Sequence, residues 1–205
     1  LARETQGHPL CTVEIVREMK AQGTLREDDT GRWVESSDTT WDTLPTRVEG
    51  IIERRLHRLD SNLREVLVAA SVEGETFTAE VVAHACGLDE AVMVRRLSDD
   101  LARRHHLVRA GGVRRVGERR LSRYHFSHHL FAAHLYDSLD PVERAYRHED
   151  VGRALEALYA GETEAVAAQL AEHFQKAGRF EKAVTYLTQA GDAAAQVYAN
   201  PEAIA

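Results

Sequence analysis

The sequence predicts a mainly α-helical fold with a small β component. Apolar residues recur at spacings of three and four through most of the 205 residues, and this is the period of an amphipathic helix. Alternation of apolar and polar residues, which is the period of a strand, is confined to short stretches. Capping and turn residues separate the stretches, as at Asp140, where an acid precedes Pro141 at the start of a helical pattern.

The first elements are a helix, a hairpin and a second helix. Pro9 begins a helical pattern that Gly23 ends. Residues 24–35 contain two short strand patterns around a turn that includes glycine, so they predict a hairpin. Residues 48–59 form the next amphipathic pattern, and a further helix is expected to begin near Ser61.

A winged helix is expected in the middle of the chain. A short helix over 78–86 and a longer one over 89–105 follow the helix at Ser61. Two strand patterns then enclose a basic stretch that contains Gly111-Gly112. Three helices followed by a β-hairpin is the order of a winged helix, an elaboration of the helix-turn-helix. We therefore predict a winged-helix domain over residues 44–139.

The rest of the chain reads as helices rich in alanine. One helix is expected over 128–139, a second from Pro141 to Tyr159, and a pair over 163–191 that ends at Gly191. Small residues beside large aromatic ones allow close helix packing, as in helical repeats of the tetratricopeptide type. Residues 140–205 are thus predicted to form a tetratricopeptide-like region of an α-solenoid, and the helical pattern at the last residues predicts that this region is truncated.

In this order, the elements resemble the STAND class, the signal-transduction ATPases of the AAA+ superfamily that occur in multidomain bacterial regulators. The resemblance covers essentially the whole chain. It implies that residues 1–43 are the end of an ATPase helical lid with a short hairpin. Its anchors are Gly7-His8-Pro9-Leu10, Leu44-Pro45, the segment Arg119–His128, the segment Phe126–Phe131 and Ala190-Gly191.

The resemblance also implies a nucleotide site to which this chain contributes. Gly7 and Pro9 would lie near the adenine, and His128 would contact the phosphates in the resting state, with His129 at the position of the family's acidic residue. The winged helix would clamp the nucleotide-bound resting state, and the helical repeats would sense a signal or protein partner. Release would involve the parent's own ATPase core, an effector domain outside this chain and possible homo-oligomer formation.

The chain lacks the parts that phosphoryl transfer requires. No Gly-x-x-x-x-Gly-Lys-Ser/Thr phosphate-binding loop occurs in the sequence, and the Gly111-Gly112 pair lies in a hairpin instead of before a helix. ATP or ADP with Mg²⁺ is expected to bind the parent protein, whereas these 205 residues alone are expected to bind no cofactor and to have no enzymatic activity.

Basic charge is concentrated in the middle of the chain. Residues 91–136 carry a net charge of +7, between flanks of −8 and −6. In the helix over 89–105, arginines and aspartates alternate at a spacing of four, which predicts two ladders of ion pairs. The predicted wing carries six arginines that could face acidic surfaces of the same protein or nucleic acid. These are Arg109, Arg114, Arg115, Arg119, Arg120 and Arg123.

Two alternative functions remain open. The first is a DNA-binding winged-helix regulator that uses its basic wing, and the second is a protein-interaction scaffold without a nucleotide role. Cys11 and Cys86 are predicted to be inert buried thiols in a reducing cytoplasm. His125 and His129 have a spacing that can hold a metal on a helix, but no third ligand lies beside them, so no metal site is predicted. No apolar run is long enough for a membrane span.

Overall fold

A computed structural model describes the chain at residues 12–13, 16–17, 19–20, 23, 25–28, 31–35 and 48–198. The chain divides into two compact units, residues 1–60 and 61–205, and each is described by itself. The described residues are mainly helical, with one two-stranded and one three-stranded antiparallel sheet, which confirms the predicted mainly α fold with a small β component. The predicted site residues Gly7 and Pro9 lie outside the described residues.

The first unit contains the predicted hairpin and helix. β1 (Leu25–Glu27) pairs antiparallel with β2 (Trp33–Glu35). Gly31 adopts φ +80° in the turn between them, a conformation that glycine reaches without a steric penalty. α3 (Val48–His57) follows and buries one apolar face. Both elements lie where the sequence predicts them.

The second unit begins with helices around a strand that the sequence analysis missed. α4 (Ser61–Glu73) leads to β3 (Thr76–Thr78), and α5 (Ala79–Ala85) follows at once. Thr78 is the residue that precedes α5, as predicted, but its hydroxyl makes no capping hydrogen bond. Its backbone N–H instead donates to a carboxylate oxygen of Glu73 over 3.0 Å. Only three residues long, β3 is recognisable by its pairing and not by its own period.

The predicted helix over 89–105 consists of two segments of different pitch. α6 (Glu90–Arg95) continues directly into a π-helix, η2 (Arg96–Arg104). A step of four residues slightly exceeds one turn of an α-helix, so side chains at this spacing drift around its surface. The wider turn of the π-helix offsets this drift. It keeps three side chains buried on one face: Met93, Leu97 and Leu101.

A three-stranded sheet completes this half of the unit. β4 (Val108–Val116) and β5 (Arg119–Phe126) form a long hairpin, and β5 also pairs with β3, which gives the order β3-β5-β4. Both strands extend into the basic stretch that the sequence analysis places between the two strand patterns. Gly111 lies at a bulge in β4, where any larger side chain would overlap the ring of His125. A larger residue at this position must therefore displace the His125 ring.

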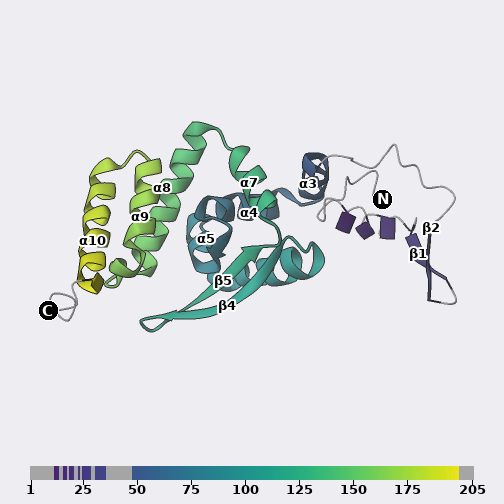
Figure 1. Ribbon diagram of the computed structural model, residues 1–205, viewed down its shortest axis with the longest axis horizontal. Coiled ribbons are helices and arrows are strands. Elements are labelled where there is room, and N and C mark those ends of the chain that lie inside the picture. Colours follow the sequence, from purple (N-terminus) through teal and green to yellow (C-terminus); the bar gives the residue numbers. More distant parts are fainter. Residues whose placement is uncertain are drawn as a thin grey trace. The chain divides into compact units, whose positions relative to one another are not determined.

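The remaining elements are helices that lie side by side. α7 (His129–Asp137) is followed by α8 (Pro141–Leu158), the 3₁₀-helix η3 (Thr163–Val166), α9 (Ala167–Lys176) and α10 (Phe180–Tyr198). Figure 1 shows α8, α9 and α10 packed as neighbours in green to yellow.

The predicted stop at Gly191 is wrong, because this residue lies inside α10. Nothing lies within 4 Å of where a side chain on Gly191 would be, so no tertiary contact forces the helix to end there. The next residues, Asp192 to Ala195, include three alanines, which have the highest helix propensity. Their propensity outweighs the cost of about 1 kcal/mol of one glycine in a helix interior.

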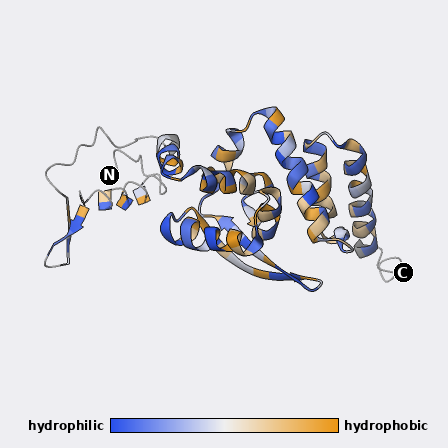
Figure 2. Ribbon diagram, turned by 180° about the vertical axis from the view of Figure 1, so that it is seen from behind, coloured by the Kyte–Doolittle hydropathy of each residue, from blue (hydrophilic) through white to orange (hydrophobic). Residues whose placement is uncertain are grey.

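One apolar cluster joins the hairpin to the helices that follow it. Val116 and Leu121, near the far end of the hairpin, are buried together with side chains of α8, η3 and α9. Figure 2 shows hydrophilic residues at the tip of this hairpin. The hairpin is therefore covered along part of one face. The helical members of the cluster include Val151, Leu155, Leu158, Val166, Leu170 and Phe174.

Candidate functional site

His128 lies at the junction between the sheet and the helices. It is the N-cap residue of α7, with an extended backbone (φ −152°, ψ 138°), and its Nδ1 accepts a hydrogen bond from the Leu130 backbone N–H at 3.2 Å. Its half-buried ring stacks on that of His129, with ring centroids 4.4 Å apart. Because Nδ1 accepts, the neutral ring carries its proton on Nε2. This arrangement makes Nε2 a hydrogen-bond donor.

The other two predicted nucleotide contacts cannot be placed beside His128 from the described part of the chain. Gly7 and Pro9 lie outside the described residues and belong to the first compact unit. His129 is exposed, and its ring packs against His128. Of the predicted nucleotide-binding residues, His128 is therefore the one whose geometry the described part of the chain provides.

The six arginines of the hairpin are all exposed. Arg115 and Arg120 are direct cross-strand partners, so two positive charges lie opposite each other. None of the six forms an ion pair with another described residue. Arg123 slightly favours the ionised form of Glu73, but burial has the larger effect on this carboxyl group and raises its pKa.

Only part of the predicted charge ladder forms on η2. Arg103 donates to Asp99 over 2.8 Å, and both side chains are exposed. No other ion pair joins the arginines and aspartates of residues 95–104 in the described structure. A π-helix changes the angle between residues four apart, so the i, i+4 rule for α-helices no longer places every such pair together.

A buried chain of three hydrogen-bonding side chains was missed by the sequence analysis. The Tyr136 hydroxyl lies 2.9 Å from His148 Nε2, and His148 Nδ1 lies 2.9 Å from His173 Nδ1. These side chains come from α7, α8 and α9. His148 and His173 are only 1% and 3% exposed. Burial is the main cause that lowers the pKa of His148 to about 3 and that of His173 to about 4, so both rings are neutral at pH 7.

A signal for this chain was present in the sequence. His148 lies three, four and seven residues before Val151, Gly152 and Leu155, all of which are buried. His173 lies three residues after buried Leu170. A histidine on the apolar stripe of a helix is expected inside, where it needs a polar partner. Which residue becomes that partner depends on how the helices pack, so the sequence of one helix does not identify it.

Among the described residues, the cysteine and the remaining histidines do not form a catalytic or metal site. Burial raises the pKa of the Cys86 thiol to about 11, so this half-buried cysteine is a poor nucleophile, as predicted, whereas Cys11 lies outside the described residues. His125 lies on β5, and its Nδ1 is 2.8 Å from the Thr76 hydroxyl. Within the described ranges, no group of three or more His, Cys, Asp or Glu side chains is arranged to hold a metal ion.

No protein-family model, curated protein or solved structure matches the chain. Among the helices that the structure describes, none combines the length and the apolar character that crossing a membrane requires.

Proposed function

We propose that this chain is the regulatory segment of a STAND-type signal-transduction ATPase. In this proposal, the winged helix predicted over residues 44–139, whose helices and sheet extend from α4 to β5, clamps the parent protein in its nucleotide-bound resting state. The helices after it receive an activating signal or protein partner. The observation that carries the proposal is the strand order β3-β5-β4 beneath three helices, followed directly by His128 at the start of α7.

The order of elements supports the winged-helix assignment. A helix, a strand, two helical segments and a hairpin follow one another from α4 to β5. The first strand pairs with the last, which supports a small sheet in which β4 and β5 form the wing. The apolar cluster that buries Val116 and Leu121 against α8 and η3 supports a wing that contacts protein along one face.

The geometry of α9 and α10 supports the repeat-like assignment. Phe174 stacks on Tyr186 with ring centroids 5.8 Å apart, and Ala183 is buried between the helices. On the other side of α10, Phe180, Val184 and Leu187 are 66%, 61% and 55% exposed. Their spacing places them on one helical face, and an exposed apolar face of this kind is typical of a docking surface for another helix.

The described residues fit a role for His128 beside a nucleotide. Its Nδ1 is used in capping α7, which fixes the ring at the N-terminal end of a helix of nine residues. An Nε2–H donor at a helix N-terminus is suited to a phosphate oxygen, because the helix dipole also favours negative charge there. The remaining phosphate contacts would come from the parent's ATPase core, since the chain has no phosphate-binding loop.

Two substitutions at His128 separate the nucleotide role from the capping role. His128→Asn keeps a side-chain acceptor for the Leu130 N–H but removes Nε2, whereas His128→Ala removes both. In the full-length parent, we expect both variants to lose the ADP that the wild type retains through purification. His84→Asn, at an exposed position on α5, is the control. If His128→Asn retained ADP as the wild type does, the clamp would be refuted.

A nucleic-acid-binding wing is the second candidate. The exposed, like-charged pair Arg115 and Arg120 supports it, because two adjacent arginines without an acidic partner favour an anionic one. The test is a DNA titration of the 205-residue chain at several salt concentrations. Removing both arginines should weaken binding and reduce its salt dependence, whereas Arg103→Ala, which removes an arginine already paired with Asp99, should change neither. Absence of salt-dependent binding would exclude this candidate.

A further inference from the structure

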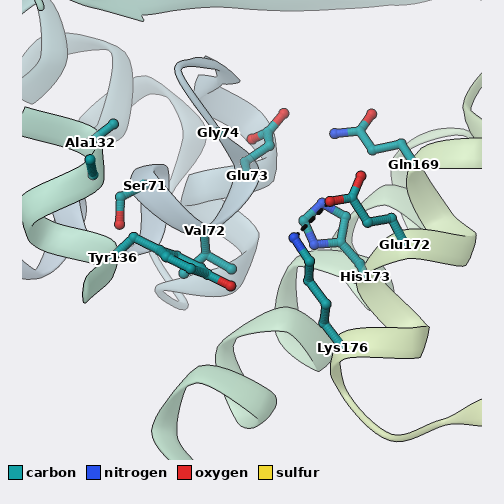
Figure 3. Close-up of a pocket in the computed structure, with 11 residues that line it drawn as sticks. Ser71, Val72, Glu73, Gly74, Ala132, Tyr136, Gln169, Glu172, His173 and Lys176 are labelled. Atoms are coloured by element: carbon teal, nitrogen blue, oxygen red, sulfur yellow. Dashed lines mark hydrogen bonds and ion pairs between the residues drawn. The ribbon is translucent and has the colours of Figure 1, made fainter. Parts of the chain in front are cut away.

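A cavity of about 280 Å³ opens where α4, α7 and α9 meet. Figure 3 shows Tyr136 on one side of it and His173 and Lys176 on the other, with Glu73 between them at the end of α4. All of these residues belong to the second compact unit. The cavity is close in size to the smaller ligand pockets of proteins, and it mixes apolar and polar walls as they do.

The cavity is lined by a largely buried histidine, His173, and one of its ring nitrogens has no partner among the described residues. His173 is only 3% exposed, and its Nδ1 is bonded to His148. Its Nε2 has no hydrogen-bond partner in the described part of the chain. In the described part of the chain, the side-chain polar atoms that lack a hydrogen bond and are also fully buried are Nη1 of Arg55 and Nε of Arg144. His173 Nε2 is not one of them. The Nε2 of His173 is therefore not fully sealed, and His173 lines the cavity.

The hydrogen-bonded chain couples the two sides of the cavity. If His148 Nδ1 carries the shared proton, His173 has its proton on Nε2 and is a donor to the cavity, while Tyr136 donates to His148. If His173 Nδ1 carries it, Nε2 is an acceptor and His148 donates to Tyr136, whose hydroxyl proton is then available to the cavity. With either tautomer, Tyr136 and His173 together offer one donor and one acceptor.

The cavity has no net charge to offer a ligand. Lys176 is paired with Glu172 over 2.7 Å, and both histidines are neutral at pH 7. Burial raises the pKa of Glu73 to about 8, so its carboxyl group is mostly protonated at that pH. A charged ligand would lose its hydration here without gaining an opposite charge. A neutral polar ligand needs no opposite charge, so it avoids this cost.

We propose that this cavity binds a small uncharged ligand that carries both a hydrogen-bond donor and an acceptor, such as a primary amide, between Tyr136 and His173. The ligand would contact α4, which belongs to the proposed winged helix, and α9, which belongs to the helical pair. It would therefore stabilise the packing of these two parts against each other. This site does not depend on the proposed nucleotide role, because none of its residues is a predicted nucleotide contact.

Three probes of nearly the same shape test the chemistry of the ligand. Benzamide is neutral, benzoate is an anion and benzylamine is a cation, and each is titrated into the 205-residue chain while imidazole nitrogen resonances are followed by NMR. We expect benzamide to shift the His173 Nε2 resonance saturably, with a Kd of about 1–10 mM as is usual for so small a ligand. Benzoate and benzylamine should bind at least about tenfold more weakly. Stronger binding of either ion, or no saturable shift with benzamide, would overturn the proposal.

Matched variants test the residues. His173→Asn keeps a polar atom near the position of Nδ1, toward His148, and removes Nε2, so it should weaken benzamide binding about tenfold or more. Tyr136→Phe removes the hydroxyl at the other side and serves as the second variant should His173→Asn unfold. His84→Asn, at an exposed position that does not line the cavity, should bind benzamide as the wild type does. Unchanged affinity in Tyr136→Phe or in folded His173→Asn would refute the site.

Discussion

Replacing His148 by Gln and His173 by Asn should remove much of the acid sensitivity of the second compact unit. Both rings are buried and neutral, and burial is the largest cause of their lowered pKa values of about 3 and 4. Gln and Asn can still hydrogen-bond near the positions of His148 Nε2 and His173 Nδ1, but neither can take up a proton. The double variant therefore separates the packing of the pair from its titration.

Other groups act on the pair in both directions. Lys176 on α9 and Arg144 on α8 oppose protonation of His148, whereas Glu172 favours it. Glu172 also favours protonation of His173, and Lys176 opposes it. Tyr136 on α7 contributes a neutral hydrogen bond. Desolvation exceeds each of these effects for both rings, so the net result is a pair that stays uncharged.

The sign and size of the effect follow from linkage. In the unfolded chain each histidine takes up a proton as the pH falls through its ordinary pKa of 6.5, whereas the folded pair does not until about pH 4 and 3. Stability is thus fully present above pH 6.5 and is lost below it. Each proton contributes about 1.4 kcal/mol per pH unit to the change in the free energy of unfolding. For two protons between pH 6.5 and 4.5, the largest possible loss of stability is therefore about 5 kcal/mol. Water penetration and local relaxation reduce this to about 3 kcal/mol.

The assay is urea denaturation followed by far-ultraviolet circular dichroism at several pH values between 7.5 and 4.5. Near pH 7 the double variant should be less stable than the wild type by about 1–3 kcal/mol, since its hydrogen bonds are imperfect. This gap should shrink by about 3 kcal/mol at pH 4.5. Glu73, whose raised pKa makes folding more favourable as the pH falls from 8 to 4.5, is present in both proteins and cancels in the difference.

The control applies the same replacements to exposed histidines. His84→Gln with His106→Asn leaves the buried pair intact, and Asn suits the positive φ of 52° at residue 106. This control should show the pH dependence of the wild type. If the gap between the wild type and the buried-pair variant stayed constant from pH 7.5 to 4.5, the rings would not be neutral and desolvated in the fold, and the reasoning would be refuted.

Four further substitutions test the local interactions. Asp140→Ala removes the acceptor of two backbone N–H bonds at the start of α8 and should lower the free energy of unfolding by about 1 kcal/mol in urea titration. Phe174→Ala empties the centre of the apolar cluster, where the ring is 1% exposed, and should lower it by about 3–5 kcal/mol; a loss below 1 kcal/mol would contradict the described packing. Gly111→Ala must displace His125 and should lower the melting temperature, whereas Gly191→Ala, on α10, should raise it slightly.

Elements with local signals could be predicted from the sequence. Asp140 accepts hydrogen bonds from two backbone N–H groups at the start of α8, and Gly87 and Gly161 have positive φ at the predicted ends of helices. The hairpin of the first unit and the N-terminal end of α7 at His128 also lie where the pattern indicates. Each of these features depends on residues within about four positions of one another, so the information is present in a short window.

Other features were decided by contacts between distant segments. β3 is a strand because β5 pairs with it, and the change to a π-helix after Arg95 keeps a buried face aligned with the sheet. The i, i+4 charge pattern of residues 95–104 therefore produced one ion pair instead of two ladders.

The sequence by itself determined where most helices begin, that the β content is small and that the basic charge lies on the hairpin, since these depend on local propensity and composition. The tertiary structure decided which polar groups are buried together. His148 and His173 are 25 residues apart, and their hydrogen bond exists because α8 packs against α9 while α7 supplies Tyr136. Burial makes a polar group costly unless it is paired, and pairing depends on the packing of whole helices, which no short window of sequence contains.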